Sequence, residues 1–146
     1  MRVGGLRAAG FVLLAALAGC APDPGTGPRE LVWDREPCER CRMAISDRQH
    51  AAEVRIADDR RVRAFDDLGC ALLWLDEHGM RPVEIFVRSR DGDRWLDGSE
   101  LHYEGGRHTP MGYGFGAAAS GAPGRTLEEV WAEVRAMEDE RRDGRR

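Results

Sequence analysis

Three cysteines and a methionine of this chain have types and spacings that suit a soft metal ion. Cys38 and Cys41 form a Cys-x-x-Cys pair, Met43 follows two residues later, and Cys70 lies further along the chain. Thiolate and thioether sulfur atoms together select Cu(I). A structural zinc site would need four Cys or His ligands instead, and His50 could supply the fourth. In an oxidising compartment Cys38 and Cys41 could also form a disulfide, but one thiol would then be left over.

A second group of candidate ligands lies in the stretch His108-Thr109-Pro110-Met111-Gly112. Met111 stands between a proline and a glycine, and no amphipathic pattern surrounds it. A methionine in such a loop fits a distal soft ligand that is brought over a metal site, and His108 could bind the same ion. The alternative is that Met111 fills an irregular apolar gap.

Local patterns predict the elements that bring the cysteines together. Residues 53–57 and 61–65 are short and rich in β-formers, which predicts a β-hairpin. Asp66 and Asp67 follow as N-cap residues of a helix over 68–78 that stops at Gly79. Cys70 falls in the first turn of this helix. A knuckle, a hairpin and a helix in this order resemble the treble-clef zinc modules, with the fourth cysteine missing.

The rest of the chain predicts the fold class. Residues 83–88, 93–96 and 100–104 read as short strands, and 105–124 as a glycine-rich loop. Thr126 and Glu129 form a capping box for a last helix. Apolar residues then recur at helical spacing: Leu127, Val130, Trp131, Val134 and Met137. We therefore predict one small α+β domain with two ββα-type halves, the first of them treble-clef-like.

Composition excludes several classes of protein. The chain has 146 residues, which suits one domain. Its formal net charge of −4 argues against a nucleic-acid partner, which requires a basic surface. The mean hydropathy of −0.52 excludes a polytopic membrane protein.

The N-terminus predicts export and lipid attachment. Arg2 and Arg7 precede an apolar run that is too short to span a bilayer, which is typical of a signal peptide. The run ends in Leu-Ala-Gly-Cys, which resembles a bacterial lipobox, so Cys20 is the predicted lipidation site. We thus expect a signal peptide over 1–19, a tether over 20–30, a folded domain over 31–138 and a charged tail over 139–146.

Three motifs in this order behind a lipobox resemble the NosL family, the accessory lipoproteins of nitrous oxide reductase. The motifs are Cys-x-x-Cys-x-Met at 38–43, Phe-Asp-Asp-Leu-Gly-Cys at 65–70 and Pro-Met-Gly at 110–112. The resemblance covers about 38–136. It implies a pair of ββα-type subdomains and a Cu(I) metallochaperone that faces the periplasm or the cell exterior. It also implies two partners, which are nitrous oxide reductase and an ABC-type maturation complex in the membrane.

Carried over to this sequence, the resemblance assigns the copper ligands first to Cys41, Met43 and Met111. Cys38 and Cys70 match a common form of the family. The family pattern has glycine at the position of Arg42, which suggests a backbone conformation that glycine favours. An arginine beside thiolates would in addition lower their pKa.

We therefore predict a lipid-anchored Cu(I) carrier of the cell envelope that transfers its ion by ligand exchange and is not an enzyme. Two alternatives stay open. A thiol–disulfide oxidoreductase would use Cys38 and Cys41, although such enzymes place Cys-x-x-Cys at the start of a helix within a βαβ pattern. A binding module held together by structural zinc would use the same cysteines.

Overall fold

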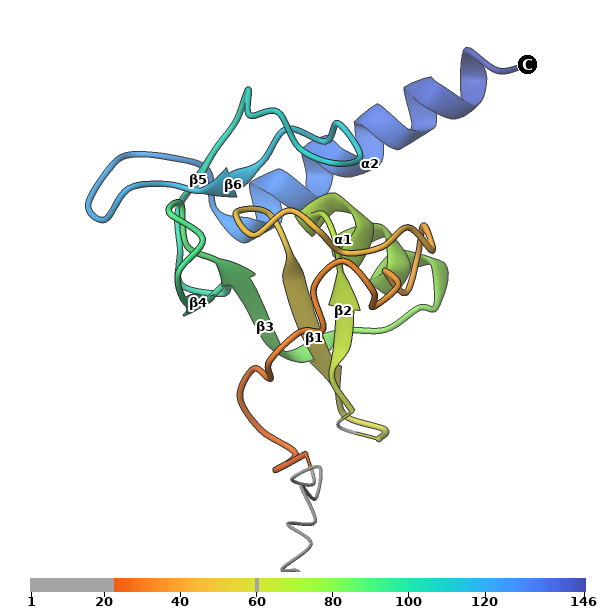
Figure 1. The fold of residues 1–146 in the computed structure, drawn as a ribbon. Helices are drawn as coiled ribbons and strands as arrows, with labels where there is room; N and C mark the ends of the chain where they lie inside the picture. Colours follow the sequence, from red (N-terminus) through yellow and green to blue (C-terminus); the bar gives the residue numbers. More distant parts are fainter. Residues whose placement is uncertain (1–22, 60) are drawn as a thin grey trace, which may run out of the picture.

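The predicted hairpin forms one side of the main sheet in the computed structural model, which describes residues 23–59 and 61–146 (Figure 1). β1 (Ala52–Ile56) pairs with β2 (Arg63–Phe65) and with β3 (Pro82–Arg88), and β3 pairs with β4 (Trp95–Asp97). The four strands are antiparallel in the order β2-β1-β3-β4. The two predicted ββα halves therefore share one continuous sheet, and the predicted α+β class is confirmed.

Two helices pack beside each other at this sheet. α1 (Leu68–Glu77) begins at Asp67, whose side chain accepts a hydrogen bond from the N–H of Gly69, and it is buried from Leu68 to Leu75. α2 (Leu127–Asp143) begins with the predicted capping box of Thr126 and Glu129. Its buried residues include Val130, Trp131 and Val134. The Trp131 ring N–H donates to the Asp76 carboxylate at 2.9 Å, which joins the two helices.

The charged C-terminal stretch differs from its prediction. α2 continues through Asp143, beyond Glu138, where we expected the folded domain to end. Figure 1 shows that the last turns of α2 project beyond the rest of the domain. Acidic residues in its first turn and Arg141 and Arg142 in its last turn complement the helix dipole, which helps such a polar helix to persist.

The glycine-rich segment contains a strand that the sequence did not predict. β6 (Gly116–Ala117) pairs with β5 (Tyr103–Glu104) in a two-stranded ribbon, and β5 is shorter than the expected strand over 100–104. Tyr103 is fully buried and its hydroxyl donates to the carbonyl of Gly98 at 2.5 Å. The ribbon thus contains a buried aromatic side chain, and its two-residue strands are too short to show an alternating pattern in the sequence.

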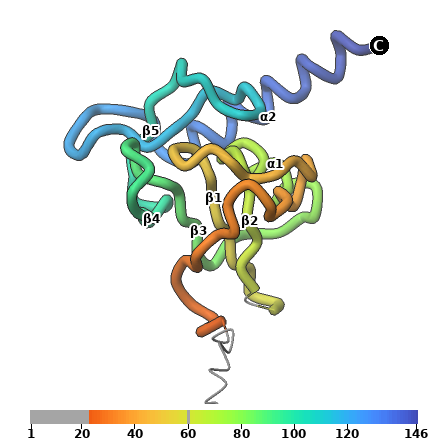
Figure 2. Tube along the Cα trace, viewed as in Figure 1, coloured from red at the N-terminus to blue at the C-terminus, as the bar shows by residue number. Residues whose placement is uncertain are grey.

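The described part of the predicted tether lies against the sheet. Glu53 and Arg55 are fully buried on the face of β1 opposite to Ala52 and Val54. The Arg55 guanidinium pairs with the Asp23 carboxylate at 2.7 Å and donates to a carbonyl in the same segment. We call residues 23–36 the strap. Figure 2 shows the strap rising along the sheet from its lower end.

Glu53 should make stability depend on pH. Burial raises the pKa of Glu53 from 4.5 to about 7. One of its oxygens accepts the N–H of Arg29 at 2.9 Å, whereas Oε1 has no hydrogen-bond partner among the described residues. Between pH 4.5 and 7 the folded state therefore binds more protons than the unfolded state, so the Glu53 contribution to stability falls as pH rises.

We expect Glu53→Gln to remove this loss. The free energy of unfolding of the variant minus that of the wild type should then increase by roughly 2 kcal/mol between pH 4.5 and pH 7. Urea unfolding across this range measures the difference. The exposed Glu100→Gln is the control, and its stability should follow that of the wild type across this range. A constant difference between Glu53→Gln and the wild type at all pH values would contradict the prediction.

Candidate metal centre

Cys38 and Cys41 lie in a tight turn that the backbone fixes. The N–H of Arg42 donates to the Cys38 carbonyl at 3.1 Å, and the N–H of Cys38 donates to the Met43 carbonyl at 2.8 Å. A bridge between Pro37 and Ala44 closes this turn. We call residues 37–44 the knuckle. The N–H of Glu39 donates to the carbonyl of Ala64 at 2.9 Å, so the knuckle is attached to β2.

Arg42 has the backbone conformation that its position suggested. Its φ is 66°, in the left-handed region that glycine adopts without cost. A residue with a Cβ pays about 1 kcal/mol or more there. The Arg42 side chain is 71% exposed and lies 3.5 Å from the Glu39 carboxylate, so it points to solvent. Arg42 therefore adopts a backbone conformation that glycine favours, as its position suggested.

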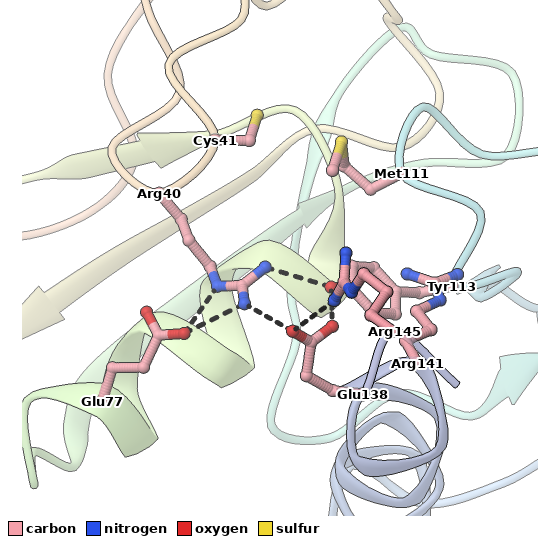
Figure 3. A pocket seen from close by; sticks show the side chains of 8 residues that line it. All are labelled: Arg40, Cys41, Glu77, Met111, Tyr113, Glu138, Arg141 and Arg145. Carbon is pink, nitrogen blue, oxygen red and sulfur yellow. Dashed lines mark hydrogen bonds and ion pairs between the residues drawn. The ribbon is translucent and has the colours of Figure 1, made fainter. Parts of the chain in front are cut away.

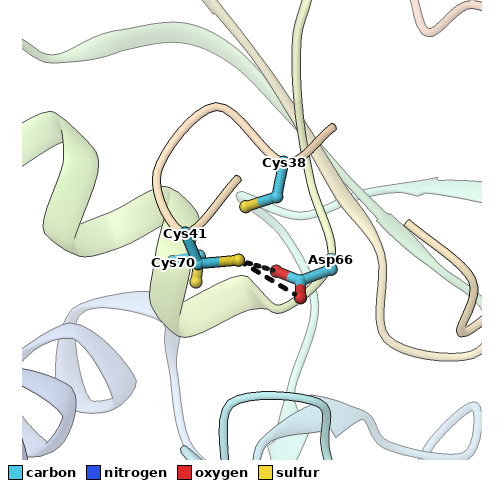
Figure 4. A group of neighbouring side chains, drawn as sticks. All are labelled: Cys38, Cys41, Asp66 and Cys70. Carbon is cyan, nitrogen blue, oxygen red and sulfur yellow. Dashed lines mark hydrogen bonds between the residues drawn. The ribbon is translucent and has the colours of Figure 1, made fainter. Parts of the chain in front are cut away.

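Four ligand atoms converge where the knuckle meets the start of α1. Cys38 and Cys41 come from the knuckle, Asp66 follows β2, and Cys70 lies in the first turn of α1. Their sulfur and carboxylate atoms all lie within 4.8 Å of one another (Figure 4). Metal–ligand bonds to sulfur and oxygen are about 2.0–2.3 Å long, so atoms this close can surround one ion. The chain therefore has a site that could hold a metal ion.

The three cysteines of this cluster differ in how accessible they are to solvent. Cys38 and Cys70 are fully buried, and Cys41 is partly exposed. All three are free thiols. Cys20, the predicted lipidation site, and the predicted signal peptide lie outside the described residues. An ion in the cluster would thus be reached from the side of Cys41.

Asp66 belongs to the cluster, and sequence reasoning missed it. We interpreted Asp66 and Asp67 together as helix caps, but the cap is Asp67. Both Asp66 carboxylate oxygens lie 3.4 Å from the Cys41 sulfur. Asp66 occupies the place in the ligand set that we had considered for His50. The His50 ring instead contacts the Asp47 carboxylate at 2.9 Å and is not part of the cluster.

The cluster holds one acidic thiol and two that resist ionisation. A hydrogen bond from the Cys70 thiol, helped by backbone N–H groups of the knuckle, lowers the pKa of Cys38 to about 7. Burial raises the pKa of Cys41 to about 12, and the interaction with Cys38 raises the pKa of Cys70 above its ordinary value. The side chain of Arg42, which we expected to lower these pKa values, is not among the causes. Binding by all three sulfurs would therefore release protons.

Asp67 connects the cluster to the predicted methionine loop. One of its oxygens accepts the N–H of Gly69 at 2.8 Å. The other accepts the Thr109 hydroxyl at 2.7 Å and the N–H of Met111 at 3.1 Å. The same carboxylate thus fixes the first turn of α1, which carries Cys70, and the backbone of Met111.

Met111 and Cys41 line one open hollow of about 370 Å³. Figure 3 shows their two side chains across from each other at the same mouth of this hollow. Met43 is 52% exposed at the end of the Cys-x-x-Cys-x-Met motif. His108 is also exposed. The structure thus places one of the two predicted methionine ligands beside a thiol of the cluster and leaves the other at the surface of the knuckle.

The surroundings of Cys38 are relevant to the alternative that Cys38 and Cys41 act as the redox pair of a thiol–disulfide oxidoreductase. Reactive cysteines combine a low pKa with exposure. Cys38 has the lowered pKa but is fully buried, and it lies in the knuckle before β1 rather than at the start of a helix. The arrangement therefore disfavours attack on an external disulfide.

A scan of protein-family models, a search of curated proteins and a search of solved structures each find no match for this chain. Among residues 23–59 and 61–146, neither helix has the length and apolar character needed to cross a membrane.

Proposed function

We propose that this protein is a lipid-anchored, extracytoplasmic Cu(I) carrier that supplies copper for the assembly of nitrous oxide reductase. The observation that carries the proposal is a sulfur-rich ligand set with one open side. Three thiols converge, and the Met111 side chain lines the hollow that reaches Cys41. Thiolate and thioether ligands favour Cu(I) over harder ions.

The same arrangement suits release as well as binding. Cu(I) is stable with two or three ligands, so a partner's sulfur can enter while one of the carrier's ligands leaves. Cys41 is partly exposed and Met111 lies on a loop, which gives the ion a route that the buried Cys38 and Cys70 do not offer. The exposed Met43 is a second thioether on the accessible side of the knuckle. The partners proposed for this exchange are nitrous oxide reductase and an ABC-type membrane complex, on the strength of the motifs alone.

A structural zinc site is the second candidate, and one observation favours it. Cys38, Cys70 and the carboxylate of Asp66 are buried, and with Cys41 they make a set of four potential ligands. Structural zinc sites are closed sets of four ligands, mostly thiolate and imidazole. In such a protein the two thioethers would have no role in binding.

Anaerobic titration of the reduced chain from Ala21 onward separates the two candidates. Cu(I) is titrated against a competing chelator, and Zn(II) in parallel. We expect one Cu(I) per chain, and we expect Met111→Leu to lower its affinity about tenfold while that of Zn(II) is unchanged. Met137→Leu, a change of the same kind on α2, is the matched control. The loaded protein should then raise the copper content of copper-free nitrous oxide reductase.

Preference for Zn(II), or Cu(I) binding that is indifferent to Met111→Leu and Met43→Leu together, would contradict the copper proposal and favour structural zinc. Copper binding that survives Cys41→Ser together with Met43→Leu would show that the ligands are assigned wrongly.

A further inference from the structure

The hollow beside the cluster has a charged wall opposite its two sulfur atoms. Arg40 leaves the knuckle next to Cys41, and its guanidinium donates to the Glu77 carboxylate at 2.9 Å and to the Tyr113 hydroxyl at 3.0 Å. Its side chain is only 14% exposed. Glu138, on α2, accepts from the Tyr113 hydroxyl at 3.0 Å and lies 3.4 Å from Arg40 (Figure 3). Both carboxylates of the hollow therefore already have cationic partners.

Two further arginines, Arg141 in the last turn of α2 and Arg145 just beyond it, are less well compensated. The Arg141 guanidinium lies over the Tyr113 ring at 4.5 Å and donates to the Gly112 carbonyl at 3.0 Å. Among the described residues it forms no ion pair with a carboxylate. Arg145 is 69% exposed, and its one carboxylate contact, to Glu138, is 4.0 Å long. The rim thus carries an excess of positive charge on a protein whose formal net charge is −4.

The position of these arginines sets what they can contact. Arg141 lies in the last turn of α2 and Arg145 lies two residues beyond its end, and both line the hollow that contains Cys41 and Met111. Gly112, which Arg141 contacts, is the residue after Met111. A group that enters the hollow to reach the two sulfur atoms therefore comes within range of the two guanidinium groups.

We propose that this hollow is the docking face for an acidic segment of the protein that exchanges metal with this chain. Carboxylates of the segment pair with Arg141 and Arg145, and a sulfur or imidazole ligand between them reaches the ion at Cys41 and Met111. This inference rests on the metal exchange proposed above, and it adds the chemistry of the partner. Attraction of this kind acts mainly on the rate of association and weakens as salt is added.

The test measures metal transfer to two peptide acceptors by stopped-flow. One acceptor has Met and His ligands spaced by Asp and Glu, and the other has Asn and Gln in their place. We expect the Cu(I)-loaded chain to deliver its ion to the acidic peptide at least about tenfold faster at low salt, with the advantage shrinking at high salt. Arg145→Glu should slow transfer to the acidic peptide about fivefold and leave transfer to the uncharged peptide within about twofold.

Arg94→Glu is the matched control. Arg94 is 66% exposed, lies 3.9 Å from the Asp93 carboxylate and is on the β3–β4 turn, away from the end of α2. Its reversal changes net charge equally and should change neither rate by more than about twofold. Arg145 is used for the decisive variant because it holds no loop in place, unlike Arg141.

Equal rates for the two peptides, or equal slowing by Arg145→Glu and Arg94→Glu, would overturn this inference and leave the carrier function standing. Loading is measured first. A chain that takes up no Cu(I) would overturn the proposed function, and the inference with it.

Discussion

Metal loading is expected to stabilise the folded domain, and Cys70→Ser is expected to abolish most of that effect. An ion that binds only the folded state at about 1,000 times its Kd adds roughly 4 kcal/mol to the free energy of unfolding. For a domain of this size that raises the Tm by roughly 15–20 °C. Cys70 is fully buried in the ligand cluster. A serine hydroxyl at this position is a poorer ligand for a soft metal ion than the thiolate, and water does not reach the position to act as a ligand in its place.

Because removing a neighbour of a metal ligand already costs 10–100-fold in affinity, removing this ligand should cost at least about 100-fold. The measurement is the Tm with and without metal, for each variant. Ala71→Ser is the control, because it places a hydroxyl at the next buried position of α1 and leaves the cluster intact. Comparing the metal-induced shift cancels any effect on the empty protein. Equal shifts in Cys70→Ser and Ala71→Ser would show that Cys70 is not a ligand.

Gly69→Ala is expected to destabilise the protein by about 3 kcal/mol, although alanine is the better helix former by about 1 kcal/mol. The reason is the close approach of Tyr113 to the first turn of α1. A Cβ at Gly69 would lie 2.2 Å from the Tyr113 Cδ2 atom and 2.7 Å from its Cβ. Urea unfolding of the variant measures the cost.

A background without the Tyr113 side chain provides the control. In Tyr113→Gly, which removes both the ring and its Cβ, Gly69→Ala should be neutral or stabilising, so the two substitutions should be strongly non-additive. A cost that persists in that background, or a stabilising Gly69→Ala in the wild type, would contradict the packing argument. The contact also brings the methionine loop close to Cys70, so we expect Gly69→Ala to weaken metal binding.

Elements with local signals were predictable from the sequence. The capping box at Thr126 and the hairpin before Asp67 are encoded within a few residues, and the structure has both. The convergence of Cys38, Cys41 and Cys70 followed from the order of knuckle, hairpin and helix. Which metal the cluster takes, and whether Met43 binds it, stay predictions.

Features that depend on contacts between distant segments were not predictable. β6 is a glycine and an alanine without a strand pattern of their own, and they pair with β5, where Tyr103 is buried. Asp66 differs from Asp67 by one position, yet the turn after β2 directs it to Cys41 while its neighbour caps α1. The strap is held by Arg55 and Glu53, charged residues that composition alone would place at the surface.

If Cys20 carries the lipid that we propose, the strap would limit how far the domain can stand from a bilayer. Asp23 is held by Arg55 near the end of β1, whereas Asp66 follows Phe65, which pairs with the first residue of β1. The attachment point and the ligand cluster are thus at opposite ends of the sheet. With the lipid that we propose on Cys20, three residue steps, or at most about 10 Å of extended chain, would separate Cys20 from the pinned Asp23. The cluster would then face away from the membrane at a restricted distance from its surface. There it would be accessible to the extramembrane parts of partner proteins and not to groups inside the bilayer.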